Sequence, residues 1–285
     1  MNNYNQTANA PHEQKRTRYE IHIGLMIICI LLALPLLYAF WVATLTIEQA
    51  FRSPQFTIGT DFAANVKQLF SDEDFERLIR NTLVITAVVV IGKTVFSMLA
   101  GLAFVYFRFP GRWFLFFFVL LTLLMPTEII LLPLFNLVSD LGWGENHPRL
   151  AMTMPFLASA AGAFLFRQHF ANIPREMADA AQMDGATPLR FLWSILLPMS
   201  WNVIVAHCVL QFIYMWNQYL WPVIVLQQNE DMVIQQGVRN AASFSSQTDY
   251  GVLMAAGIIA SIPPIIVFIL LQKQFMSGFA LTRDK

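Results

Sequence analysis

The stretch ANIPREMADAAQMDGATPLRFLWSILLP, residues 171–198, is the longest polar interruption in the second half of an otherwise strongly apolar chain. Pro174 suits the first position of a helix, where a missing N–H costs nothing. Gly185 supplies the left-handed conformation on which helices commonly end. Thr187 and Pro188 suit the N-cap and first residue of a second helix. The stretch therefore predicts two short helices joined at a glycine.

The composition around this stretch indicates a membrane protein. Of the 285 residues, 56% are apolar and only 13% are charged, which favours the bilayer, and membrane lipid, as the surroundings of the chain. The formal net charge is zero, so nothing suggests a nucleic-acid partner. Cys29 and Cys208 have no CxxC or Cys/His ligand spacing, which leaves metal and redox chemistry without support.

Six apolar segments each approach the roughly 20 residues that cross a bilayer as a helix. Prolines interrupt the third and fourth segments at Pro126, Pro133 and Pro155, which allows one of them to be bent or partly re-entrant. An even number of spans returns both ends of the chain to one side. The expected spans lie near residues 21–46, 82–107, 113–137, 149–167, 199–226 and 251–272.

The distribution of Lys and Arg predicts the orientation. Eleven of the 18 lie in the N-terminal tail, the turn at 108–112, the loop at 168–198 with its flank, and the C-terminus. Basic residues favour the cytoplasmic side, so these parts are expected there. We divide the chain into a cytoplasmic tail, a six-helix transmembrane domain and a cytoplasmic C-terminus, at residues 1–20, 21–272 and 273–285. The domain includes an outer cap at 47–81, which either receives a soluble partner or is a solvated loop.

Lys93 and Glu128 are charges expected inside the membrane, where an ionisable side chain costs at least a few kcal/mol and usually faces a partner or a watery path. Counted from the turn at 108–112, both lie about 21 to 23 Å into consecutive antiparallel helices. We expect an ion pair, or a pair that opens onto the substrate path. The alternative is a static buried pair that only orients the two helices.

The fifth expected span contains amides among aromatic rings, at Tyr214, Trp216, Asn217 and Gln218. Polar amides within a span need partners, and rings beside them suit the passage of a polyhydroxylated solute. The alternative is an aromatic belt at the membrane surface. Small residues elsewhere, at Ser97-xxx-Gly101 and Ala158-xxx-Gly162, are typical of closely packed helices.

No enzyme site is predicted. Gly92-Lys93-Thr94 resembles the end of a P-loop, but Ala87 stands where that motif needs glycine. The five histidines have neither metal spacing nor a neighbouring nucleophile. Catalytic residues, metal ligands and cofactors are therefore not expected.

The alternative of a self-sufficient secondary transporter predicts repeated or inverted halves of the sequence, and no internal repeat is visible.

The loop at 168–198 resembles the cytoplasmic coupling loop of ABC importer permeases. The motif of that family is EAA, three residues, glycine, nine residues, then I-x-L-P. Asp179-Ala180-Ala181, Gly185 and Ile195-Leu196-Leu197-Pro198 stand at these spacings, with Asp179 in place of the usual glutamate. Segments such as GKTVFSMLAGLAFVYFRFPGR (92–112) and QKQFMSGF (272–279) are similar to the carbohydrate-uptake group of these permeases.

The resemblance implies an all-α membrane protein, with six transmembrane helices of the MetI-like type and a cytoplasmic coupling helix, in the bacterial inner membrane. It implies four kinds of partner or substrate: a second permease subunit, two ATPase subunits that bind ATP and Mg, an extracytoplasmic solute-binding protein, and a solute. Within the group, the chain is most similar to permeases for sn-glycerol-3-phosphate, while a neutral sugar, oligosaccharide or polyol stays open. The residues implied in ATPase coupling are Asp179, Ala180, Ala181, Asp184, Gly185, Ile195, Leu197 and Pro198.

Overall fold

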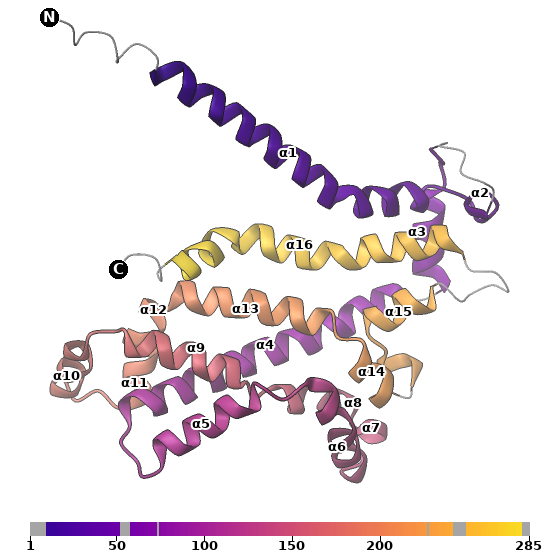
Figure 1. Ribbon diagram of the computed structural model, residues 1–285. Coiled ribbons are helices and arrows are strands. Elements are labelled where there is room, and N and C mark those ends of the chain that lie inside the picture. Colours follow the sequence, from indigo (N-terminus) through magenta and orange to yellow (C-terminus); the bar gives the residue numbers. More distant parts are fainter. Residues whose placement is uncertain (1–9, 52–57, 73, 227, 242–248, 281–285) are drawn as a thin grey trace, which may run out of the picture.

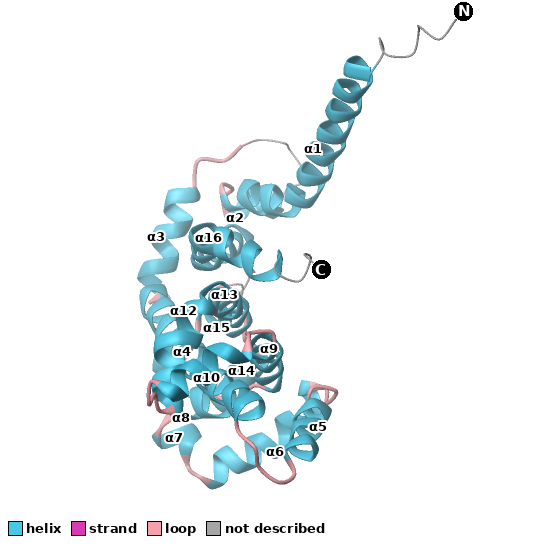
Figure 2. Cartoon of the chain, turned by 90° about the vertical axis from the view of Figure 1, so that its left-hand side faces the viewer, coloured by secondary structure: helices cyan, strands magenta, loops and turns pink. Residues whose placement is uncertain are grey.

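The chain folds into helices, in a computed structural model that describes residues 10–51, 58–72, 74–226, 228–241 and 249–280 (Figure 1). No strand occurs among these residues (Figure 2). The predicted all-α class is therefore confirmed. The helices are α1 (Ala10–Ala43), α2 (Ile47–Phe51), α3 (Phe62–Asp72), α4 (Phe75–Tyr106), α5 (Arg112–Thr122), α6 (Thr127–Asp140), α7 (Trp143–Asn146), α8 (Pro148–Thr153), η1 (Met154–Phe156), α9 (Ala160–Ala171), α10 (Arg175–Met183), α11 (Pro188–Phe191), η2 (Leu192–Leu196), α12 (Leu197–Met199), α13 (Trp201–Trp216), α14 (Leu220–Val225), η3 (Asn229–Asp231), α15 (Ile234–Asn240) and α16 (Tyr250–Ala280).

Three of the described helices are long and apolar enough to cross a bilayer without a break: Tyr19–Ala43 of α1, Phe75–Tyr106 of α4 and Tyr250–Ser277 of α16. Two bent pairs raise the candidates to as many as five. In the first pair, Pro148–Phe156 meets α9 at 41°. In the second, Pro188–Met199 meets α13 at 84°. The count of six spans, and the division of the chain built on it, remain predictions.

The third expected span is divided into α5 and α6, which is a break of the kind that its prolines allow. Pro126 separates the two helices with φ −59° and ψ 136°. Proline disfavours the helical conformation in the residue before it, which ends α5 ahead of this position. Figure 2 shows α6 running from α5 toward α7.

The fifth expected span is also interrupted, so one continuous helix over 199–226 is wrong. Helix α13 ends at Trp216, and α14 begins only at Leu220. Between them, Asn217 Nδ2 donates to the carbonyl oxygen of Ile213 at 2.8 Å. Such a local bond from side chain to backbone competes with helix continuation.

Helix α4 is the centre of the bundle, with α9 and α13 packed against it and α16 against α13 (Figure 1). A Cβ added at Gly101 of α4 would stand 2.7 Å from Phe166 Cβ and 2.9 Å from its carbonyl carbon. A Cβ at Gly162 of α9 would stand 3.0 Å from His207 Cε1. Both glycines therefore permit close helix contact, as the small-residue pattern predicts.

The first helix is nearly detached from this bundle. The C-terminal part of α1 contacts α16, and the rest of α1 points away from the bundle (Figure 1). An 18-residue window of its apolar stretch has no residue buried within the chain, and only its C-terminal end, at Val42 and Ala43, is buried. The connection that follows is held by Asn65, whose Nδ2 donates to the carbonyl oxygens of Ala43 at 2.9 Å and Leu45 at 3.1 Å. The described part of the expected outer cap consists of α2, α3 and the first turns of α4, with α3 packed against α16.

Candidate functional site

The polar loop forms a short helix with a well-defined end. Helix α10 follows Pro174, which is its N-cap instead of the expected first residue. Gly185 has φ +70° and ends the helix. The Ala186 N–H donates to the carbonyl oxygen of Ala181 at 2.9 Å, and the Gly185 N–H to that of Gln182 at 3.0 Å. This is the Schellman arrangement, in which glycine avoids the steric cost of a left-handed residue.

The second helix of the loop begins as predicted, with the Thr187 hydroxyl accepting from the Arg190 N–H at 3.3 Å. It continues as a π-helical turn over Leu192–Leu196, where the Leu197 N–H reaches back to the carbonyl oxygen of Leu192. Pro198 explains this widening, because proline lacks an N–H and its ring crowds the carbonyl four residues earlier. The chain then turns by 84° into α13.

One face of α10 packs into the bundle. Ala178 and Ala181 are 7% and 5% exposed and join the apolar cluster at the end of α4 and α9. Ala180 and Met183 point to the opposite side, and the Met183 side chain is 88% exposed. We call the exposed side chains of Met177, Ala180 and Met183 the outer face of α10. Ala181 therefore packs within its own chain, although the motif places it beside Ala180.

The other residues of the coupling motif differ in exposure. Asp179, Asp184, Gly185 and Pro198 are exposed, while Ile195 and Leu197 are half-buried against the cluster that α10 joins. Met183 was not predicted as a site residue, although alternation of buried and exposed positions at helical spacing in 177–183 could have indicated it.

Three contacts connect the loop to the long helices. The ring of Tyr106, in the last turn of α4, meets Phe191 of α11 edge-on at 5.1 Å. Its hydroxyl donates to the carbonyl oxygen of Phe170 in α9 at 3.4 Å. His169 Nε2 and Ser200 Oγ, which lies at the 84° bend, are 3.0 Å apart. A movement of the loop would therefore be transmitted through these contacts to α4, α9 and α13 together.

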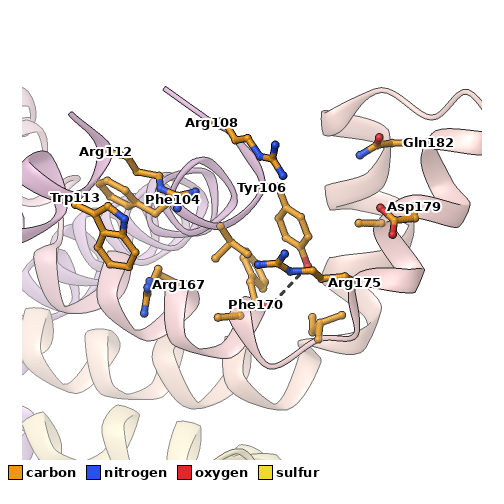
Figure 3. Close-up of a pocket in the computed structure, with 14 residues that line it drawn as sticks. Phe104, Tyr106, Arg108, Arg112, Trp113, Arg167, Phe170, Arg175, Asp179 and Gln182 are labelled. Carbon is orange, nitrogen blue, oxygen red and sulfur yellow. Dashed lines mark hydrogen bonds between the residues drawn. The ribbon is translucent and has the colours of Figure 1, made fainter. Parts of the chain in front are cut away.

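Between α10 and the bundle lies an open pocket of about 670 Å³ (Figure 3). It is lined by the end of α4, the start of α5, the end of α9 and the inner side of α10. Arginines dominate its polar lining, and Asp179 is its single carboxylate. The residues that line it are Phe104, Val105, Tyr106, Arg108, Arg112, Trp113, Arg167, Phe170, Ala171, Ile173, Arg175, Ala178, Asp179 and Gln182.

Lys93 lies in the interior of the bundle, 6% exposed. Its Nζ donates to Gln211 Oε1 at 3.0 Å and stands 5.2 Å from the centre of the Tyr214 ring. The structure thus brings two predicted path residues, Lys93 and Tyr214, together with one that was not predicted. The Glu128 side chain lies outside the described ones, so its pairing with Lys93 stays a prediction.

The remaining path candidates lie elsewhere. Trp216 is 1% exposed, and its Nε1 donates to the carbonyl oxygen of Ala260 at 2.9 Å, so it packs between α13 and α16. Asn217 and Gln218 lie past the end of α13, and Gln235 Nε2 donates to Asn217 Oδ1 at 3.3 Å. These two amides are therefore not deep within a continuous span.

Helix α13 carries a polar stripe that we did not predict from the sequence. His207, Gln211 and Tyr214 stand four and three residues apart, which places them on one face of the helix. His207 is 2% exposed, and neither its Nε2 nor Ser97 Oγ of α4 has a hydrogen-bond partner among the described residues. This spacing was the available signal for Gln211.

The fold and the coupling loop define a class of membrane transport subunit. Residues 93–279 match the family described as binding-protein-dependent transport system inner membrane component. The chain belongs to this family and is a multi-pass inner-membrane permease subunit of an ABC importer.

Two individual relatives are similar to this chain over most of its length. The chain is 37% identical over 270 residues to the sn-glycerol-3-phosphate transport system permease protein UgpE of Rhizobium meliloti (strain 1021), covering 92% of this chain and 95% of the relative. It is 36% identical over 265 residues to UgpE of Yersinia pestis bv. Antiqua (strain Antiqua), covering 90% and 94%.

Two solved structures share the fold. One belongs to a bacterial ABC transporter involved in the import of the acidic polysaccharide alginate, with a TM-score of 0.77, 23% identity, and coverage of 96% of this chain and 100% of that one. The other is a bacterial alginate ABC transporter in complex with an alginate pentasaccharide-bound periplasmic protein, with a TM-score of 0.66, 18% identity, and coverage of 93% and 96%.

Proposed function

We propose that this chain translocates sn-glycerol-3-phosphate across the inner membrane as one permease subunit of an ATP-driven importer. The observation that carries the proposal is the identity of 36–37% to UgpE proteins over at least 90% of the chain. A buried lysine near the middle of α4 adds support, because a phosphate monoester favours cationic and N–H donors along its path.

The complete importer would contain a second permease subunit, two ATPase subunits and an extracytoplasmic solute-binding protein. ATP and Mg would be bound by the ATPases, and this chain would bind no cofactor. The solved relative in complex with a periplasmic protein supports the last of these partners. Both termini and the loop at 168–198 would be cytoplasmic, which the excess of basic residues on that side supports.

The outer face of α10 would dock into a cleft of one ATPase subunit. Its exposed methionine and alanine side chains suit such a contact, since methionine adapts to irregular apolar surfaces. Asp179, Asp184 and Gly185 would border the contact, and Ile195, Leu197 and Pro198 would anchor the loop to α13. Closure of the ATPase pair would push α10, and the bundle would rock between inward-open and outward-open states.

The substrate path would include the polar group on α4 and α13. Lys93, Gln211 and Tyr214 are in contact there, and Gln211 already uses its Oε1 to accept from the lysine. An arriving phosphate would compete for the same ammonium group, because a charged acceptor forms a stronger hydrogen bond than an amide.

The test is uptake by the reconstituted importer, with its partners, in liposomes containing ATP. Radiolabelled sn-glycerol-3-phosphate should accumulate, and an excess of unlabelled maltose or glycerol should not reduce its uptake. Preferential accumulation of a neutral sugar, oligosaccharide or polyol would overturn the substrate proposal. Uptake by the permease chain alone without ATP would overturn the proposed coupling.

A further inference from the structure

The pocket between α10 and the bundle carries an excess of positive charge that the coupling role does not use. Arg108, Arg112, Arg167 and Arg175 line it, against the single carboxylate of Asp179. Among the described residues, none of the four guanidinium groups forms an ion pair. An unpaired group of like charges repels itself, so the pocket favours an anionic occupant.

Most of the guanidinium donors in this pocket have no hydrogen-bond acceptor among the residues that the structure describes. Arg112 Nη1 donates to the carbonyl oxygen of Phe107 at 3.1 Å, and Arg167 Nη1 donates to Gln168 Oε1 at 3.2 Å. Each guanidinium has five N–H donors in a planar fork, so both retain several for another acceptor. In Figure 3, Arg112 and Arg167 lie beside Trp113, and Arg108 lies beside Tyr106. The geometry of the fork suits the oxygens of a phosphate group.

The pocket lies where helices leave the apolar part of the chain. The α4 candidate span ends at Tyr106, and α9 ends at Ala171. Trp113 is 54% exposed, and the centre of its ring lies 5.4 Å from the guanidinium carbons of both Arg112 and Arg167. Tryptophan beside arginine at the end of a span is typical of the headgroup region of a membrane.

An apolar surface adjoins the arginines. On α5, which also carries Trp113, Phe114 is 78% exposed, and Phe117 and Leu121 are each 61% exposed. A second hollow of about 270 Å³ shares Arg108, Arg112 and Trp113 with the pocket and also reaches Phe114. The cationic pocket therefore adjoins the exposed side chain of Phe114, at the start of the apolar surface of α5.

We propose that this pocket binds the phosphate of an anionic phospholipid, with the acyl chains along α5. The guanidinium groups of Arg108, Arg112 and Arg167 hold the phosphate, and Trp113 packs against the glycerol region. The phosphate chemistry alone would also fit a soluble phosphate ester, but the exposed Phe114 and Phe117 favour a molecule with an apolar part. Because α10 forms the opposite wall, a bound lipid supports the loop from behind while its outer face stays free. This inference is independent of the transported substrate.

The test is native mass spectrometry of the purified importer after exchange into mixed micelles of phosphatidylcholine and phosphatidylglycerol. The pocket variant is Arg108→Gln/Arg112→Gln/Arg167→Gln. The control, Lys67→Gln/Arg80→Gln/Arg149→Gln, removes the same charge from exposed positions on α3, the start of α4 and α8. We expect the pocket variant to retain phosphatidylglycerol about tenfold less and the control to stay within about twofold, since 1.4 kcal/mol corresponds to tenfold.

Two further measurements keep the result unambiguous. The variant Arg108→Lys/Arg112→Lys/Arg167→Lys preserves the charge but lacks the planar fork, so it should retain an intermediate amount of lipid. Size-exclusion chromatography shows whether each variant still assembles into the importer. Unchanged lipid retention in an assembled pocket variant, or an equal loss in the control, would overturn the proposal. Displacement of the lipid by millimolar inorganic phosphate or sn-glycerol-3-phosphate would assign the pocket to a soluble phosphate ester instead.

Discussion

At the scale of single residues, the coupling loop depends on Gly185. Its φ of +70° lies in the left-handed region, which costs a residue with a side chain roughly 1–2 kcal/mol. A Cβ at this position would meet no neighbouring atom, so the cost is one of backbone conformation and not of packing. A substitution here therefore tests the end of α10 without disturbing the bundle.

We expect Gly185→Val to reduce substrate-stimulated ATP hydrolysis of the importer several-fold, because valine strongly disfavours the left-handed region and shifts the end of α10. Gly257→Ala is the matched control, since a Cβ there also meets no atom and no positive φ is involved. ATP hydrolysis in proteoliposomes with and without loaded binding protein measures the effect. Unchanged stimulation in Gly185→Val would count against the docking role of the loop.

A second prediction for single residues concerns the expected ion pair between Lys93 and Glu128. We expect Lys93→Glu and Glu128→Lys each to reduce uptake at least tenfold, because each would leave like charges facing each other inside the membrane if the two groups pair. If the two groups pair, the double variant restores part of the lost uptake. Initial rates of sn-glycerol-3-phosphate uptake at equal expression make the measurement. Failure of the double variant to recover any uptake would contradict the ion pair and leave Gln211 as the partner of Lys93.

At the scale of helices, the contact between α4 and α9 is the most constrained. A Cβ added at Gly101 would approach Phe166 Cβ, its carbonyl carbon and the Arg167 nitrogen at 2.7, 2.9 and 3.0 Å. Two of these atoms belong to the backbone of α9, so no side-chain rotation relieves the contact. The two helices must separate.

Gly101→Ala is therefore expected to destabilise the protein by about 1–3 kcal/mol, as overpacking does. The midpoint of thermal unfolding in detergent should fall, and Gly257→Ala again serves as the control. Because α9 leads into α10, the same variant should weaken coupling along with stability. An unchanged midpoint would mean that α4 and α9 lie farther apart than described.

At the scale of the whole molecule, the two ends of the bundle should face opposite sides of the membrane. Met183 is 88% exposed on the outer face of α10, at the end where the basic residues gather. In a chain whose native cysteines are replaced by alanine, Met183→Cys should react with a membrane-impermeant maleimide in inside-out vesicles only. Addition of the ATPase subunits should protect it. Glu230→Cys, at the other end, is the control and should react in right-side-out vesicles; the reverse pattern would overturn the orientation.

Much of this molecule is readable from local sequence. The helix end at Gly185, the restart at Thr187 and the small-residue contacts at Gly101 and Gly162 each depend on residues close in sequence or on a simple spacing. The lengths of the broken helices were less predictable. The sequence shows a proline at Pro126 and two amides at Asn217 and Gln218, but only the backbone geometry shows that α5 and α13 end before these positions.

Sequence by itself determined an all-helical membrane chain with a two-helix polar loop, because apolar composition, caps and glycine act locally. Only the tertiary structure decided which side chains meet. It placed Gln211 beside Lys93, buried Trp216 against Ala260, and turned Ala181 inward and Met183 outward. It also brought arginines from three segments around one pocket. These pairings join residues far apart in the chain, and the packing angles of the helices, which no local pattern encodes, set them.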